Sequence, residues 1–145
     1  MTEQIYTEIL INAEPKKVWQ ILTDFENYPE WNSFITSLTG KVKVGNTISV
    51  RIFAPNGNSM KFNPVVLAYE PEKEIRWLGK FYFKGIFDGE HQFKLVDNKN
   101  GTTTFIHAES FSGFLVPFFK NNLSHTKTGF EEMNLELKEM AELPH

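Results

Sequence analysis

The residues of this chain best suited to chemistry inside an apolar fold are two histidines and a glutamate, His91, His107 and Glu109. Imidazole and carboxyl groups can hydrogen-bond a ligand, exchange protons or bind a metal ion. Four interpretations follow. The three residues could satisfy one another as a structural cluster, or orient a ligand's carboxyl, hydroxyl or ketone. Alternatively, His91 or His107 could act as a general base whose tautomer Glu109 sets, or all three could bind iron or zinc.

We expect neither a metal nor a cofactor. A facial arrangement of metal ligands does not follow from residues that merely share one face of a strand pair. The sequence also contains no Walker-type phosphate loop, no Gly-x-Gly-x-x-Gly turn and no Gly-x-Ser-x-Gly nucleophile motif. Nucleotide-dependent chemistry and serine-hydrolase chemistry are therefore not expected.

The turn at residues 97–101 suggests a register for the two strand-like segments that carry these side chains, 86–96 and 102–111. Pairing Val96 with Thr102 places His91 directly opposite His107, with Cβ atoms about 5 Å apart. Glu109 then lies one step away, opposite Gly89. All of these positions share one face because strand side chains alternate with period two, and a slip of one residue would separate the histidines.

The remaining candidate ligand-binding residues are large and apolar. Each could line a cavity or simply fill the core, because aromatic side chains suit both tasks. They are Trp31 and Phe34 after the first helix, Trp77 and Phe81 on a central strand, Phe111 on the strand of Glu109, and Phe119, Leu123 and Phe130 on the final helix. Gly129 beside this stripe could make room for a ligand or for a close packing contact.

The elements that must position these residues follow from local patterns. Residues 4–12 alternate like a half-buried strand, and Pro15 then opens a short helix that ends near residues 23–24. Residues 25–34 combine turn chemistry with aromatic rings that we expect to point inward. Strand-like runs separated by turn signals over residues 37–111 predict an antiparallel meander.

The last part of the chain predicts one long amphipathic helix. Apolar positions step by four and three residues through Phe119, Leu123, Thr126, Phe130, Met133, Leu137 and Met140. Proline is tolerated only in the first turn, so Pro117 places the start of the helix near residues 115–117. His125 is expected at the rim, and Glu131 and Glu132 on the solvated side. The whole pattern predicts an α+β fold in which this helix crosses one face of the sheet.

The order of these elements resembles the START-like helix-grip superfamily (SRPBCC), in its polyketide cyclase/dehydrase and lipid-transport branch. The segments that carry the resemblance are 11–19 (INAEPKKVW), 22–25 (LTDF), 28–32 (YPEWN), 88–95 (DGEHQFKL), 101–103 (GTT) and 107–113 (HAESFSG). The resemblance implies a curved antiparallel sheet wrapped around the C-terminal helix, with a cavity between them for apolar or amphipathic molecules. No catalytic motif is common to the superfamily, so it assigns no catalytic residue here.

Composition limits the other possibilities. The 145 residues, 41% of them hydrophobic, suit a single domain over 1–145, and 14 phenylalanines indicate a large apolar interior. The absence of cysteine excludes disulfides, thiolate nucleophiles and Cys-ligated metals. A net charge of −3, without a basic run beyond Lys16-Lys17, argues against nucleic acid as a partner. Residues 1–6 lack a signal-peptide pattern and 114–119 are too few to span a bilayer, so we expect a cytoplasmic protein without stable membrane insertion.

Three hypotheses for function remain open. The leading one is a non-catalytic carrier or sensor that binds a hydrophobic or amphipathic small molecule, lipid-like or polyketide-like, between the sheet and the last helix. The second is a cyclase or dehydratase that uses a cavity histidine with a near-neutral pKa, together with Glu109. The third is a protein-interaction module, as in the chaperone-activating relatives of this fold.

Overall fold

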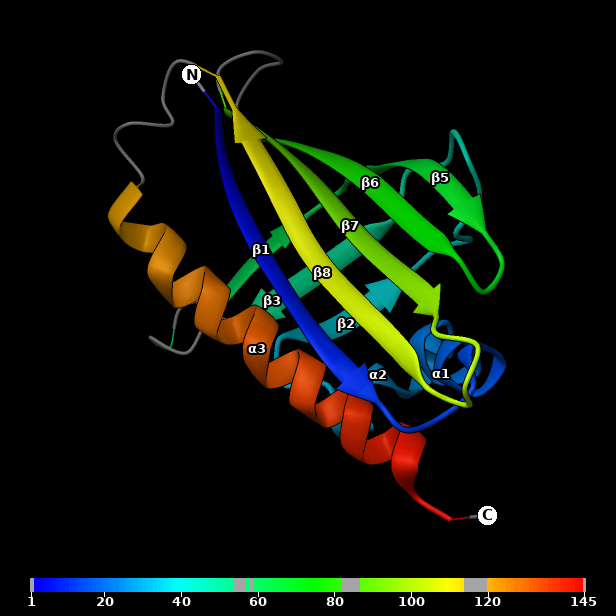
Figure 1. Ribbon diagram of the computed structural model, residues 1–145. Coiled ribbons are helices and arrows are strands. Elements are labelled where there is room, and N and C mark those ends of the chain that lie inside the picture. The colour runs from blue at the N-terminus through cyan, green and yellow to red at the C-terminus, as the bar shows by residue number, and fades with distance from the viewer. Residues whose placement is uncertain (1, 54–56, 58, 82–86, 114–119, 145) are drawn as a thin grey trace.

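Two antiparallel sheets and a long C-terminal helix enclose one apolar interior in the computed structural model, which describes residues 2–53, 57, 59–81, 87–113 and 120–144 (Figure 1). The larger sheet has the strand order β1 (Thr2–Ile11), β8 (Thr103–Ser112), β7 (Phe87–Asp97), β6 (Glu74–Phe81), β5 (Val65–Glu70). The smaller sheet has the order β2 (Ile35–Thr39), β3 (Ser49–Phe53), β4 (Ser59–Phe62). A bridge between Thr47 and Val65 connects the two. The predicted antiparallel meander is confirmed.

Short helices follow the first strand, as predicted. α1 (Pro15–Leu22) begins with proline, whose fixed φ suits the first helical turn, and Val18 and Leu22 are fully buried. A 3₁₀ turn, η1 (Phe25–Asn27), and one turn of helix, α2 (Tyr28–Trp31), follow. Of the rings expected to point inward, those of Tyr28 and Phe34 are buried, whereas those of Phe25 and Trp31 remain partly exposed.

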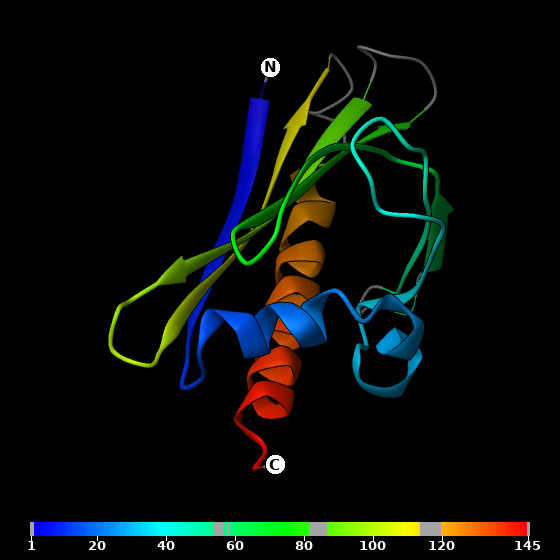
Figure 2. The ribbon, with the colours of Figure 1, turned by 90° about the vertical axis from the view of Figure 1, so that its right-hand side faces the viewer.

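The predicted long helix is α3 (Lys120–Glu142), and it runs within the curve formed by the two sheets (Figure 2). Phe130, Met133 and Leu137 are fully buried, whereas His125, Glu131 and Glu132 are exposed, as the amphipathic pattern predicts. The expected helix start near 115–117 lies outside the described residues. Among the described helices, none is sufficiently long and apolar to cross a membrane.

The C-terminal half of α3 is tied to β1, the edge strand of the larger sheet. Lys138 Nζ donates a hydrogen bond to the carbonyl of Leu10 at 2.9 Å, and the backbone N–H of Asn12 donates to Glu142 Oε2 at 2.8 Å. Lys17 on α1 donates to the carbonyl of Leu143 at 2.8 Å. The bond from Lys138 satisfies a backbone carbonyl on the edge strand, which would otherwise be open to pairing with another strand.

The predicted register of β7 and β8 is wrong by two residues. Asp97 pairs with Thr103, so His91 lies opposite Glu109, Phe93 opposite His107 and Gly89 opposite Phe111. The turn has the predicted length of five residues but lies one residue later, at 98–102, with Asn98 N–H bonded to the carbonyl of Thr102 at 3.2 Å. Because the error is an even number, every side chain stays on its predicted face.

Candidate functional site

The interior face of the larger sheet carries a continuous chain of hydrogen-bonded polar side chains. Glu109 Oε1 lies 2.9 Å from His91 Nδ1, and His91 Nε2 lies 2.8 Å from His107 Nε2. His107 Nδ1 lies 3.0 Å from Asn134 Oδ1. Asn134 Nδ2 donates to Thr7 Oγ1 at 2.8 Å, and the Thr7 hydroxyl donates to the carbonyl of His107 at 2.7 Å. We call these five residues the buried polar chain.

Three strands and one helix supply the residues of the buried polar chain. Thr7 lies on β1, His91 on β7, His107 and Glu109 on β8, and Asn134 on α3. The two histidines are diagonal rather than direct cross-strand neighbours, yet their rings still meet, with centroids 4.8 Å apart. Long side chains can reach a diagonal partner across an antiparallel pair. The predicted proximity of the histidines is therefore found, with a different backbone pairing.

A glycine makes room for the Glu109 carboxyl. A Cβ added at Gly89 would lie 2.3 Å from Glu109 Oε2 and 3.5 Å from Cδ1 of Phe111. No real side chain tolerates the first of these distances, so the carboxyl occupies the space that a side chain at position 89 would take. Phe111, one of the predicted ligand-binding residues, is buried beside it.

Aromatic rings enclose the two histidines. Trp77 stacks on His91 with ring centroids 5.0 Å apart, and Phe130 stacks on His107 at 3.9 Å. Phe34 meets Phe130 edge-on at 5.3 Å, and Phe93 contacts both imidazoles at 4.8 Å. Three of the predicted ligand-binding residues, Phe34, Trp77 and Phe130, therefore pack directly around the polar chain and fill the space there.

Burial in this apolar shell keeps the polar chain uncharged. Desolvation lowers the pKa of His91 to about 3 and raises the pKa of Glu109 to about 8. The pKa of His107 is also well below its usual value because of desolvation and the neighbouring His91, although hydrogen bonds to Asn134 and the Phe130 backbone oppose the shift. Desolvation therefore favours the neutral form of both imidazoles and the protonated form of Glu109.

The neutral chain is built for hydrogen bonding. Both ring nitrogens of each histidine are already engaged within it, so neither imidazole has a lone pair directed at a metal ion. A His91 with a pKa of about 3 is a weak base, which does not fit the near-neutral histidine that a cyclase mechanism would use. The pKa of Glu109, about 8, lies closer to neutrality than that of His91.

The other predicted site residues lie apart from the polar chain or outside the described residues. Trp31 packs edge-on against Tyr28 with centroids 5.2 Å apart, next to the second sheet. Phe81 ends β6, and its side chain is outside the described part of the structure, as is all of Phe119. Leu123 is partly buried on the first turns of α3.

Gly129 has a packing explanation. A Cβ at this position would lie 2.5 Å from Cδ1 and 2.8 Å from Cε1 of Phe34. The space beside α3 that a ligand could have used is thus occupied by the Phe34 ring. Asn32 positions that ring, because its Oδ1 accepts hydrogen bonds from the backbone N–H groups of Phe34 and Ile35 at 3.0 and 2.8 Å.

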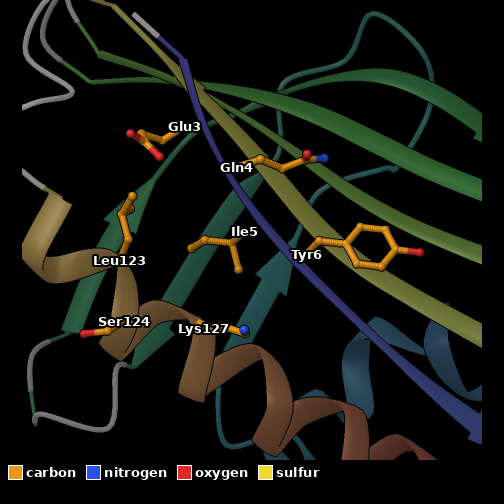
Figure 3. A pocket seen from close by; sticks show the side chains of 7 residues that line it. All are labelled: Glu3, Gln4, Ile5, Tyr6, Leu123, Ser124 and Lys127. Atoms are coloured by element: carbon orange, nitrogen blue, oxygen red, sulfur yellow. The ribbon is translucent and has the colours of Figure 1, made fainter.

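A groove of about 360 Å³ lies between β1 and the N-terminal turns of α3. Its lining residues are Glu3, Gln4, Ile5, Tyr6, Leu123, Ser124 and Lys127. In Figure 3, Ile5 points from β1 toward α3 and Leu123 points from α3 toward β1. Ile5 is also the direct cross-strand partner of Glu109, so a single side chain borders both the groove and the polar chain.

Two residues of the buried polar chain, Asn134 and Thr7, are not among the site residues predicted from the sequence. Asn134 lies on the buried face of α3, one helical turn after Phe130, and the sequence signal was a polar residue between Met133 and Leu137. Thr7 shares the inward parity of Ile5 and Ile11 on the first strand. Both signals are weak, because small polar residues are common at such positions without any function.

Comparison with known proteins gives a consistent result. The family described as "Polyketide cyclase / dehydrase and lipid transport" matches residues 2–140. No curated protein matches the sequence closely enough to be informative. Among solved structures, the Zhui aromatase/cyclase from a Streptomyces species aligns over 98% of this chain and 94% of its own, with a TM-score of 0.78 and 9% identity.

Two further structures have the same fold. A START superfamily protein from Mycobacterium smegmatis aligns over 94% of this chain and 98% of its own, with a TM-score of 0.69 and 17% identity. The di-domain ARO/CYC protein BexL, from the BE-7585A biosynthetic pathway, has a TM-score of 0.75 and 12% identity over 99% of this chain. This chain spans 51% of BexL. At such identities the likeness establishes the fold alone.

Proposed function

Because this chain belongs to the polyketide cyclase/dehydrase and lipid transport family, we propose that it binds a hydrophobic or amphipathic small molecule, lipid-like or polyketide-like, between the larger sheet and α3. The proposed site is the end of the interior bordered by Glu109, Phe111, Ile5 and Leu123. Farther along the interior, the rings of Phe34, Trp77 and Phe130 already fill the space around the histidines.

The observation that carries this proposal is the state of the Glu109 side chain. Only Oε1 is hydrogen-bonded, to His91, while Oε2 accepts no hydrogen bond from the described residues. The side chain is 13% exposed, and its Oε2 lies above Gly89 beside the buried ring of Phe111. Pockets for small molecules combine an apolar lining with a few such polar groups.

The groove between β1 and α3 supports an approach from that side. Ile5 and Leu123 line the groove, and Ile5 is the neighbour of Glu109 on the adjacent strand. A molecule that displaces the Ile5 side chain would enter the interior beside Glu109.

A direct binding measurement tests this proposal. The neutral fluorescent probe N-phenyl-1-naphthylamine should bind with a single site and be weakened at least fivefold by Leu123→Trp, which fills the groove. Leu135→Trp is the matched control, because Leu135 lies on the same helix and is 53% exposed. Native mass spectrometry of the freshly purified protein should also detect a bound molecule. Absence of probe binding, or equal loss in both variants, would refute the placement.

A cyclase or dehydratase activity is the second candidate, and the raised pKa of Glu109 is the observation that favours it. An acid that titrates near neutral pH can exchange a proton with a hydroxyl group of a bound polyketide. In that case turnover depends on Glu109 rather than on either histidine. Glu109→Gln would then abolish turnover of a bound polyketide while retaining its binding, whereas a carrier has no turnover to lose.

A further inference from the structure

The directions of the hydrogen bonds in the buried polar chain can be followed from its inner end. The carbonyl of His107 can only accept, so the Thr7 hydroxyl donates its single proton there. Thr7 Oγ1 must therefore accept from Asn134, which directs the amide nitrogen of Asn134 toward Thr7 and its Oδ1 toward His107. The opposite amide orientation would leave two acceptors, Thr7 Oγ1 and the His107 carbonyl, facing each other at 2.7 Å.

This orientation decides where each proton of the histidines lies. Asn134 Oδ1 can only accept, so His107 carries its proton on Nδ1 and presents the lone pair of Nε2. His91 must then donate from Nε2, which leaves the lone pair of its Nδ1 directed at Glu109. Glu109 therefore donates from Oε1. Each of the five groups is neutral in this arrangement and each bond has one donor and one acceptor.

The ionic alternative, with imidazolium at His91 and carboxylate at Glu109, would place two charges inside an apolar shell. The groups that pack against His91 are Trp77, Phe93 and Phe130, together with the neutral imidazole of His107. Among the described residues, no other charged group lies within ion-pairing distance of Glu109. Separating charge in such surroundings is unfavourable, so the neutral arrangement prevails.

We propose that the bound molecule presents a hydrogen-bond donor, such as a phenolic or alcoholic hydroxyl, to Oε2 of a protonated Glu109. This inference rests on the proposed function and specifies its ligand class. With the proton on Oε1, Oε2 is the carbonyl oxygen of the acid and can only accept. A ketone, ether or carboxylate at this point would oppose one acceptor to another, and a carboxylate would add a buried charge. The amide orientation of Asn134, at one end of the buried polar chain, thus determines which ligand group Glu109 can bind at the other end.

The proton order can be tested without a ligand. Long-range proton–nitrogen correlation spectra of nitrogen-15-labelled protein report which imidazole nitrogen carries hydrogen. We expect His107 protonated only at Nδ1 and His91 only at Nε2, and Glu109→Gln should leave both tautomers unchanged. Glutamine can donate its amide N–H to His91 and keep its carbonyl oxygen at the position of Oε2. An imidazolium signal from His91 at pH 7, or either reversed tautomer, would overturn the inference.

The ligand class can be tested with two probes that share one apolar body, 2-naphthol and 2-methoxynaphthalene. We expect wild-type protein and Glu109→Gln to bind the naphthol about fivefold to tenfold more tightly, the effect of one hydrogen bond. Glu109→Leu should bind the two probes equally. Equal binding by the wild type would refute the donor requirement while leaving the proposed function intact. Binding of neither probe, together with no binding of N-phenyl-1-naphthylamine, would refute the proposed function itself.

Discussion

At the scale of single residues, Gly89 and Glu109 depend on each other. The Glu109 carboxyl occupies the volume above Gly89, and Oε1 reaches His91 from that position. A side chain at position 89 would push the carboxyl away and leave His91 Nδ1 without its partner. A buried polar atom that loses its only hydrogen bond is costly, so one methyl group here acts on several residues at once.

We therefore expect Gly89→Ala to lower the free energy of unfolding by about 1 to 3 kcal/mol in urea titrations. Gly79→Ala is the matched control, because Gly79 is the cross-strand partner of Gly89. A Cβ at Gly79 would meet the ring of Phe62 at 3.3 Å, a contact that a small shift of the ring relieves. Equal losses in the two variants would contradict the role assigned to Gly89.

The shifted pKa values also predict a pH of maximum stability. The pKa of Glu109 is raised from 4.5 to about 8, so the folded state holds a proton that the unfolded state has lost, and stability falls between those pH values. The pKa values of His91 and His107 are lowered from 6.5, so stability rises with pH up to about 6.5. Below pH 6.5 the rise in stability from the two histidines outweighs the fall from Glu109. Above pH 6.5 only the fall from Glu109 remains.

Stability in urea should therefore peak near pH 6.5 and decline toward pH 8 by up to about 1.4 kcal/mol per pH unit. Glu109→Gln removes the titrating group, so its stability should stay level over the same interval. A decline of equal size in this variant would show that another group is responsible.

At the scale of elements, α3 is held by hydrogen bonds along its C-terminal half and by close packing at its middle. Its C-terminal half is hydrogen-bonded to β1 and α1 through Lys138, Glu142 and Leu143. Its middle is fixed by close packing, because Gly129 admits the ring of Phe34 against the helix backbone. Ser33 adds a further tie from the α2–β2 connection, donating from N and Oγ to Glu136 at 3.0 and 2.9 Å.

A double-mutant cycle measures the contact between Gly129 and Phe34. Gly129→Ala alone should destabilise the protein, because the steric clash with Phe34 exceeds the roughly 1 kcal/mol that alanine gains in a helix. In a Phe34→Ala background the clash is gone, and the same substitution should be neutral or stabilising. A coupling energy near zero in urea unfolding would mean that the two residues do not share this contact.

At the scale of the whole molecule, the two sheets and the helices bury one common core. It includes Val50 from the smaller sheet, Trp77 from the larger sheet, Leu22 from α1 and Leu137 from α3. The backbone N–H of Phe53 also donates to the carbonyl of Phe34 at 2.8 Å, which joins β3 to the segment that positions the Phe34 ring. Contacts of this kind favour unfolding as a single unit.

The tryptophans can test this cooperativity. Trp19 on α1 meets Tyr69 on β5, with ring centroids 5.5 Å apart, whereas Trp77 lies beside the buried polar chain. The variants Trp31→Phe/Trp77→Phe and Trp19→Phe/Trp31→Phe each leave one of these reporters. Within each variant, the fluorescence midpoint in urea should coincide with the far-ultraviolet circular dichroism midpoint. An earlier fluorescence transition for Trp19 would indicate that α1 and β5 unfold separately.

Local sequence patterns were sufficient to predict the helices and strands of this protein and which side chains share one face of each. Period-two alternation predicted a half-buried first strand, in which Ile5 and Thr7 share the buried face, and helical spacing predicted the burial of Phe130, Met133 and Leu137. The family resemblance added the order in which these elements pack. Parity also placed His91, His107 and Glu109 on one face, and it survived the two-residue error in register because it depends only on whether a position is odd or even.

Only the tertiary structure decided which atoms meet. Asn134 lies 27 residues from His107, and Thr7 lies 127 residues from Asn134, so no local pattern could join them in one chain. No local pattern could predict the contact between Phe34 and Gly129 either. The Phe34 ring occupies the space beside Gly129 that could have held a ligand. Alternation and helical period restrict the direction of a side chain, whereas contact requires the relative placement of distant elements, which the packing of the whole core sets.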